Sequence, residues 1–152
     1  MQSLSIDRKF SDLPLAITMG EPGGINSEIF LKAIKEVNKI KNFIICDPSW
    51  IEKSLKFFNK NMPINILDEN LYTKENYINI FPTKKNVIFK LGKPNKRNNN
   101  AIIESIDKAI YFAKNKKISG IVTLPIYKKN LIEDGFKFPG HTEYLSYKDN
   151  SE

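Results

Sequence analysis

The chain has 152 residues, the usual length of one domain and enough to bury a hydrophobic core. Hydrophobic residues make up 41% and charged residues 27%, a composition that excludes a wholly disordered, collagenous or disulfide-stabilised chain. The single cysteine, Cys46, cannot form an internal disulfide, and no apolar run approaches the roughly 18 residues that a membrane span needs. Residues 1–10 lack the apolar segment of a signal peptide, so we expect a cytoplasmic protein without a membrane partner.

The chain is basic, with 24 Lys+Arg against 17 Asp+Glu and a net charge of +7. A basic domain can bind nucleic acid, and such a domain would show steeply salt-dependent binding. However, Arg8 and Arg97 are the only arginines, and nucleic-acid sites usually rely on arginine to contact bases and phosphates. We therefore expect no nucleic-acid partner. A small phosphorylated anion fits the basic charge equally well.

The chain is predicted to begin with a strand, a glycine-bearing loop and a helix. Leu13–Met19 is a short apolar run typical of a buried strand, and Gly20–Gly24 is a loop by composition. Asn26 is expected to cap a helix that extends to about Lys39. The apolar face of this helix is predicted to contain Ile29, Phe30, Ala33, Ile34 and Val37.

A second strand is predicted over Asn42–Cys46. It leads into a helix in which Asp47 is the N-cap and Pro48 the first helical residue, ending near Phe58. The inward side chains of this helix are predicted to be Trp50, Ile51, Leu55 and Phe58.

The middle of the chain is predicted to hold a third strand over Pro63–Leu67 and a fourth over Asn86–Leu91, whereas residues 68–82 show no clear pattern. Gly92–Asn100 is expected to be a flexible polar loop. Apolar residues at helical spacing then predict a helix over Ala101–Asn115.

The last third is predicted to hold a buried strand over Gly120–Leu124, which ends at Pro125, and a short helix that ends at Gly135. That helix is expected over Tyr127–Asp134, and a further helix begins at Thr142. Strands that alternate with helices are typical of an α/β fold.

Two of the loops that follow predicted strands contain candidate anion contacts. The segment Thr18–Asn26 can bring backbone N–H groups near an anion, although it matches neither a dinucleotide-binding fingerprint nor a Walker A motif; the alternative is a tight strand–helix turn. In Val122–Lys129, Thr123 and the lysines lie near a strand end. Lys128 or Lys129 would then meet a phosphate or carboxylate, the alternative being solvated charge on a helix.

The third candidate segment is Pro139–Glu143, which contains His141, the only histidine. An imidazole and the Thr142 hydroxyl at a helix start can hold an anion or an alcohol together with free backbone N–H groups; the alternative is a helix-capping pair. One histidine, one cysteine and scattered carboxylates form no recognisable metal-ligand cluster. Cys46 is expected to pack as a small apolar residue, because no second histidine can activate it.

These three segments, in this order, resemble the PdxA family of 4-hydroxythreonine-4-phosphate dehydrogenases. Thr18–Ile25 (TMGEPGGI) matches the family pattern Thr-x-Gly-Glu-Pro-x-Gly-Ile. Thr123–Lys128 (TLPIYK) is similar to Thr-Gly-Pro-x-x-Lys, and Phe138–Glu143 (FPGHTE) matches Phe-x-Gly-His-Thr-Glu. The resemblance spans nearly the whole chain and implies an α/β fold like that of the isocitrate and isopropylmalate dehydrogenases.

The resemblance also implies an activity. It is the metal-dependent, NAD-using oxidation and decarboxylation of 4-phosphohydroxy-L-threonine in pyridoxal phosphate biosynthesis, by a homodimer. Substrate contacts in the family fall on the positions of His141 and Thr142, and Lys128 is a candidate anion contact. The resemblance assigns no catalytic residue in this chain.

The sequence departs from the family at two points. Leu124 replaces the usual glycine and is expected to crowd the strand end. The family chain is about twice as long, and its metal-binding histidines follow the Gly-His-Thr-Glu motif, whereas this chain has no histidine after His141. We therefore interpret residues 1–152 as one truncated α/β unit, the N-terminal part of the enzyme, with the metal ligands outside this chain and no activity alone. The alternative is a catalytically incomplete remnant or a phosphate-binding or interaction module.

Overall fold

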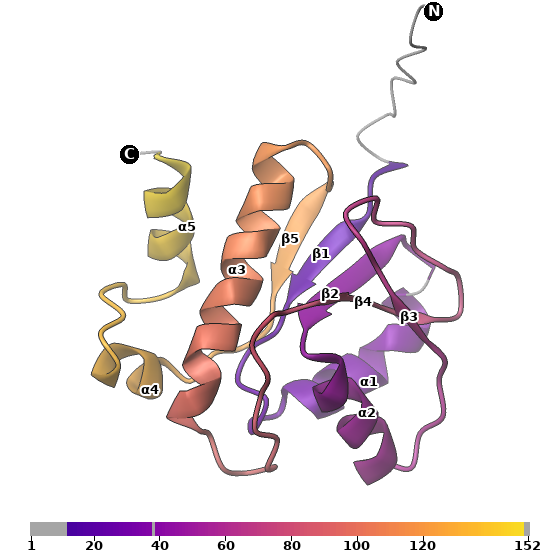
Figure 1. Ribbon diagram of the computed structural model, residues 1–152, viewed down its shortest axis with the longest axis horizontal. Helices are drawn as coiled ribbons and strands as arrows, with labels where there is room; N and C mark the ends of the chain where they lie inside the picture. Colours follow the sequence, from indigo (N-terminus) through magenta and orange to yellow (C-terminus); the bar gives the residue numbers. More distant parts are fainter. Residues whose placement is uncertain (1–11, 38, 151–152) are drawn as a thin grey trace, which may run out of the picture.

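The computed structural model describes residues 12–37 and 39–150. They form one parallel sheet of five strands in the order β3-β4-β2-β1-β5, with helices on both faces (Figure 1). The elements are β1 (Leu15–Thr18), α1 (Asn26–Val37), β2 (Asn42–Cys46), α2 (Pro48–Phe57), β3 (Ile64–Ile66), β4 (Ile78–Pro82), the 3-10 helix η2 (Lys96–Asn98), α3 (Asn99–Lys114), β5 (Gly120–Thr123), α4 (Lys128–Glu133) and α5 (His141–Asp149). The N-terminal segment in which we predict no signal peptide lies outside the described residues.

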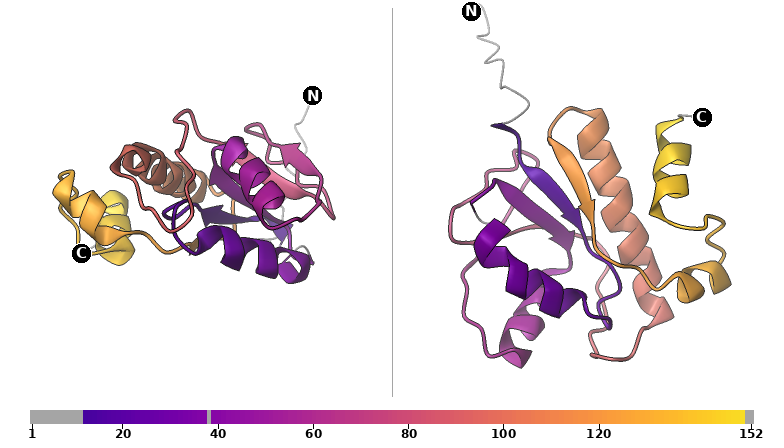
Figure 2. Two further views of the ribbon diagram at one scale, coloured as in Figure 1. Left: turned by 90° about the horizontal axis from the view of Figure 1, so that it is seen from below. Right: turned by 180° about the vertical axis from the view of Figure 1, so that it is seen from behind.

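The core is divided between the two faces of the sheet because successive strand side chains point in opposite directions. Ile44 belongs to a cluster with Phe30 of α1 and Trp50 of α2. Phe43 belongs to a second cluster with Phe112 of α3, whose ring it meets edge to face at 5.9 Å. Figure 2 shows α1 and α3 on opposite faces of the sheet. The expected α/β fold is therefore confirmed as a layered α/β/α arrangement.

The helix α1 forms where the sequence predicts it, but Asn26 does not cap it. The Asn26 side-chain amide instead donates to the carbonyl oxygens of Glu21 and Pro125, which lie outside the helix. The predicted apolar face is also partly wrong, since Ile29 is 39% exposed and Ala33 is exposed. The buried face is rotated because α1 packs against α2, where polar Ser27 is also buried and accepts a hydrogen bond from the indole of Trp50.

The predicted start of α2 is confirmed. The Asp47 carboxylate accepts hydrogen bonds from the backbone N–H and hydroxyl of Ser49, and Pro48 is the first helical residue. Three of its predicted inward residues are buried, namely Trp50, Ile51 and Leu55. The fourth, Phe58, is only half-buried.

The predicted strand over Asn86–Leu91 is wrong, and the fourth strand is β4, within the stretch without a clear pattern. Backbone N–H groups of this segment donate to side chains instead of to a neighbouring strand. The Val87 N–H donates to the Asp47 carboxylate at 2.8 Å, and the Ile88 N–H donates to Asn98 Oδ1 at 2.7 Å. The polar loop that follows is not wholly irregular, because it contains η2 and leads directly into α3.

The other predicted strands and helices form with ends shifted by a few residues. The strand β5 is confirmed, but it is not buried as predicted. It lies at the edge of the sheet, where β1 is its one partner among the described strands, and Val122 is 45% exposed. None of the helices in residues 12–37 and 39–150 has the length and apolar character needed to cross a bilayer.

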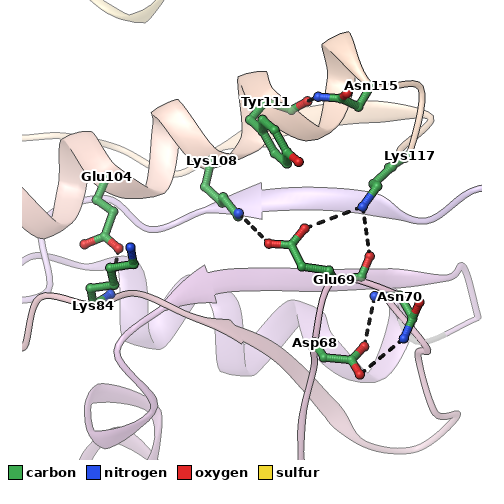
Figure 3. A network of polar contacts seen from close by, with 9 residues as sticks. All are labelled: Asp68, Glu69, Asn70, Lys84, Glu104, Lys108, Tyr111, Asn115 and Lys117. Atoms are coloured by element: carbon green, nitrogen blue, oxygen red, sulfur yellow. Dashed lines mark hydrogen bonds and ion pairs between the residues drawn. The ribbon is translucent and has the colours of Figure 1, made fainter.

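The connection from β3 to β4 contains no helix, although the two strands are parallel. Figure 3 shows Lys108 of α3 and Lys117 pointing toward Glu69 in this connection. The Lys108 ammonium lies 2.7 Å and the Lys117 ammonium 3.5 Å from the Glu69 carboxylate. The hydrogen bond from Lys108, followed by its charge, lowers the pKa of Glu69. This polar cluster attaches the connection to the α3 side of the sheet.

Candidate functional site

The carboxyl ends of parallel strands lie at one edge of the sheet, where ligands of open α/β sheets bind. Thr18 and Thr123 are register partners in β1 and β5, so the segments that follow these strands are neighbours. We call residues 20–24, which follow β1, the first loop. The Glu21 N–H donates to the Pro125 carbonyl at 3.0 Å, and the Asn26 side-chain amide donates to the same oxygen at 2.7 Å. These bonds join the first and second motif segments.

Two glycines of the first loop allow a close approach of backbone to backbone. A Cβ atom on Gly20 would lie 1.9 Å from the Pro125 oxygen, and one on Gly23 would lie 2.5 Å from the Lys93 oxygen. The loop N–H groups are also in use inside the protein, because Gly23 donates to the Glu21 carboxylate and Gly24 donates to the Glu21 carbonyl. The geometry therefore favours the tight strand–helix turn over an anion cradle at this loop.

Glu21 is the buried anchor of the first loop, with 3% of its surface exposed. Its Oε1 accepts hydrogen bonds from the Gly23 N–H at 2.9 Å and from the Asn98 side-chain amide at 3.2 Å. Asn98 is fully buried and in turn binds both the N–H and the carbonyl of Ile88. Sequence reasoning did not single out Asn98, because it lies in a run of consecutive polar residues typical of a loop.

The third motif lies beside Lys128. A Cβ atom on Gly140 would lie 3.5 Å from the Lys128 ammonium nitrogen and 3.4 Å from a carboxylate oxygen of Glu143. Burial, with a contribution from the positive charge of Lys128, lowers the pKa of His141. Two of the three predicted site residues, Lys128 and His141, are therefore close enough for the charge of the lysine to affect the pKa of the histidine.

The third predicted residue, Thr142, is exposed in the first turn of α5. Gly140 is the N-cap of this helix and no described side chain caps it, so the N–H groups of the first turn keep their capacity to bind a ligand. His141 Nε2 is a buried atom without a hydrogen-bond partner among the described residues. A cationic ammonium, an imidazole, a hydroxyl and free N–H groups are together suited to an anion that also carries a hydroxyl group.

The structure also places the remaining candidate residues. The Lys129 ammonium lies 4.0 Å from the Glu133 carboxylate, one helical turn away, and both side chains are exposed to solvent. This is the arrangement of a charged pair on a helix surface. Cys46 is fully buried in the core, and this burial raises the pKa of its thiol, so it packs as an apolar residue as predicted. Leu124 is 8% exposed and belongs to the core cluster, so its side chain packs inward.

The donor set does not fit a metal centre. In the part of the chain that the structure describes, no three histidine, cysteine, aspartate or glutamate side chains are grouped so that they could hold a metal ion. The candidate site therefore consists of the Lys128 ammonium and hydrogen-bonding groups, with one carboxylate, that of Glu143, beside them.

Comparison with known proteins agrees with the motif order. A family model described as pyridoxal phosphate biosynthetic protein PdxA matches residues 38–152. A 4-hydroxythreonine-4-phosphate dehydrogenase of Methylorubrum extorquens is 32% identical over 142 residues, covering 89% of this chain and 41% of the relative. The enzyme of the same name from Wigglesworthia glossinidia brevipalpis is 30% identical over 135 residues, covering 87% and 41%. The chain therefore spans about two-fifths of the length of these relatives.

Solved structures share the fold. The 4-hydroxythreonine-4-phosphate dehydrogenase of Burkholderia phymatum superposes with a TM-score of 0.82 at 23% identity, covering 92% of this chain and 44% of that chain. A terephthalate 1,2-cis-dihydrodiol dehydrogenase from Burkholderia xenovorans superposes with a TM-score of 0.61 at 15% identity, covering 88% and 40%. The fold agrees with the sequence match, which covers three-quarters of the chain, and the chain belongs to the PdxA family of pyridoxal phosphate biosynthetic proteins.

Proposed function

We propose that this chain supplies the substrate-binding first half of an NAD-dependent 4-hydroxythreonine-4-phosphate dehydrogenase. The curated relatives bear that name, and the observation that carries the proposal is the position of Lys128 beside Gly140 and His141 at the uncapped start of α5. The substrate is 4-phosphohydroxy-L-threonine, which carries a phosphate, a carboxylate and a hydroxyl group. The whole enzyme is a cytoplasmic homodimer, as membership of the family implies.

Each site residue has a distinct role in binding. The Lys128 ammonium attracts an anionic group of the substrate, and the N–H groups of the first turn of α5 donate to it. His141 is neutral near pH 7 because its pKa is lowered, so its ring offers one donor and one acceptor to the substrate. The Thr142 hydroxyl adds a further hydrogen bond from an exposed position.

NAD would accept the hydride from the substrate carbon, and a divalent metal would polarise the substrate hydroxyl. The described residues do not fit a metal centre, so no step through the metal is assigned to them. We place the metal ligands, and the residues that hold NAD, in the part of the relatives that this chain does not match.

Calorimetric titration of the chain with 4-phosphohydroxy-L-threonine tests the proposal. Lys128→Ala is expected to weaken binding about tenfold by removing the cation. Lys129→Ala is the matched control and is expected to leave the affinity unchanged, because that lysine faces Glu133. Equal affinities for the two variants would contradict the assigned site.

The second candidate function is a phosphate-binding or interaction module without redox activity, which the Lys128 ammonium beside the uncapped start of α5 also supports. Mixing the chain with the remaining part of a relative, NAD and a divalent metal separates the two functions. NADH formation is expected from the dehydrogenase half. Substrate binding without NADH formation would instead indicate the module.

A further inference from the structure

A groove between α2 and the segment before η2 lies away from the candidate site. It measures about 770 Å³ and is lined by Lys53, Lys56, Phe57, Phe89, Lys90 and Leu91, which we call the lysine groove. Lys53, Lys56 and Phe57 share one face of α2, because residues three and four apart are neighbours on a helix. Phe57 is 61% and Leu91 38% exposed, so the groove has an apolar surface open to a partner.

The second wall of the groove is held in place by hydrogen bonds. The Gly92 N–H donates to the Gly23 carbonyl at 2.8 Å, and the Lys93 N–H donates to the Lys90 carbonyl at 3.0 Å. The segment before this turn is held through its backbone by Asp47 and Asn98. A preformed groove binds with a smaller loss of conformational entropy than a free loop does.

The charge of the groove has a single sign. Its lining contains three lysines and no carboxylate, and none of these lysines forms an ion pair within residues 12–37 and 39–150. The neighbouring groove of about 280 Å³, across the Phe57–Phe58 ring pair, adds Lys35 and Lys60, which form no ion pair with any described residue. Its carboxylate, Glu28, is paired with Lys32 at 2.6 Å. The surface around the end of α2 is therefore strongly cationic.

We propose that the lysine groove docks an acidic peptide segment of a partner protein. An apolar side chain of that segment lies against Phe57 and Leu91, and its carboxylates face Lys53, Lys56 and Lys90. Nucleic acid fits less well, because no arginine lines the groove and could form bidentate hydrogen bonds with phosphates or bases. A concave site between a helix and an extended segment suits one peptide chain better than a flat lipid surface.

The docking surface is separate from the proposed substrate site. In Figures 1 and 2, α2 lies on the far side of the molecule from α4 and α5, which carry Lys128 and His141. The two proposals can therefore fail independently, and a variant in the groove is expected to leave substrate affinity unchanged.

Fluorescence anisotropy with a labelled synthetic peptide of glutamate and leucine tests the proposal. We expect saturable binding that weakens with salt, and a weaker response to a peptide of glutamate alone. The double variant Lys53→Glu/Lys56→Glu is expected to reduce the affinity about tenfold or more, and Phe57→Ser about fivefold. The double variant Lys116→Glu/Lys137→Glu, at exposed positions past the ends of α3 and α4, is the control matched in net charge and is expected to change the affinity less than about twofold.

Circular dichroism establishes that each variant is folded before binding is compared. Equal losses of affinity in Lys116→Glu/Lys137→Glu and in Lys53→Glu/Lys56→Glu would overturn the proposal, because the attraction would then depend on net charge alone. Undetectable binding of the glutamate–leucine peptide would also overturn it. Tighter binding to phosphatidylserine vesicles than to the peptide, with the same dependence on Lys53 and Lys56, would replace the peptide with a membrane surface.

Discussion

The centre and the edge of the sheet are built in different ways. All five residues of β2 are buried, and the strand pairs with β1 on one side and β4 on the other. Within residues 12–37 and 39–150, the edge strand β5 pairs with β1 alone, and none of its four residues is fully buried. The candidate binding residues belong to the elements that follow β5. The centre thus supplies a buried scaffold, whereas the candidate binding residues follow a strand that is only partly buried.

The edge region depends on a few specific contacts instead of bulk burial. Phe136, Phe138 and Tyr144 form an aromatic cluster with ring centroids 5.1–5.3 Å apart. The Tyr144 hydroxyl donates to the Asp107 carboxylate of α3 at 2.7 Å, which links α5 to the main body. Burial and this hydrogen bond to an anion raise the pKa of Tyr144. These contacts connect the elements that carry the candidate binding residues to α3.

The largest expected effect tests the comparison directly. Phe43→Ala in β2 removes a fully buried ring and is expected to lower the free energy of unfolding by about 4 kcal/mol. Val122→Ala in β5 is the edge counterpart and is expected to cost about 0.5 kcal/mol, because that side chain is 45% exposed. Urea denaturation of both variants measures the difference. Similar costs would show that β5 is as firmly packed as the centre.

The next effect concerns the junction between centre and edge. Gly20→Ala places a methyl group 1.9 Å from the Pro125 oxygen and is expected to cost about 3 kcal/mol by forcing the first loop away from the segment after β5. Gly24→Ala is the control within the same loop, and its nearest contact of 3.3 Å predicts a loss below about 1 kcal/mol. Thermal denaturation distinguishes them, and equal melting temperatures would mean that the junction yields freely.

A smaller effect is expected at Asn98. Asn98→Ala leaves the backbone N–H and carbonyl of Ile88 without their partner and removes one of the two hydrogen bonds to Glu21 Oε1, at a cost of about 2 kcal/mol. Asn95→Ala, in the same segment, removes one exposed cap bond to the Arg97 N–H and is expected to cost about 0.7 kcal/mol. The midpoints of urea unfolding rank the two. A reversed ranking would contradict the role of Asn98 as a buried link.

The smallest effect is a pH dependence at the edge. His141 has a folded-state pKa below the 6.5 of an unperturbed histidine, so the unfolded chain takes up this proton first. Its contribution to stability is complete above about pH 6.5 and is lost as the pH falls toward the folded pKa. NMR titration of the single histidine should give a midpoint below 6.5, and Lys128→Ala should raise it. A midpoint at or above 6.5 would place His141 outside this environment.

Most of the fold could be predicted because its signals depend on residues close together in the sequence. These signals are the apolar runs, the glycines and the Asp47-Pro48 pair that begins α2. The exception, β4, was missed because Asn79 interrupts its apolar run. Buried, Asn79 binds the Lys74 backbone, a contact that periodicity does not reveal. Conversely, the apolar residues after Asn86 resemble a strand, yet Asp47 and Asn98 take their backbone donors. Asp47 lies 40 residues away from Val87 in the sequence, and Asn98 lies in a segment whose composition is typical of a loop, so neither contact could be predicted.

The candidate site was predictable in part. The proximity of Lys128 and His141 follows from the motif spacing, since a short helix and one turn separate them. The link from Glu21 through Asn98 was not predictable, because it joins residues 77 positions apart. The role of Pro125 was not predictable either. Its residue type indicates only the end of a strand, whereas its carbonyl oxygen accepts hydrogen bonds from the Asn26 side chain and the Glu21 N–H.

The strand order has a consequence for how the protein folds during synthesis. Leu15 pairs with Gly120, so the inner strand β1 acquires one of its two neighbours only after residue 120 has been synthesised. Pairings between distant parts of a sequence slow folding, because a long loop must close before the contacts form. Until β5 arrives, β1 presents an unpaired, apolar edge that can join another chain. The candidate binding residues of α4 and α5 follow β5 in the sequence, so they can reach their places beside the sheet only after β5 has been made.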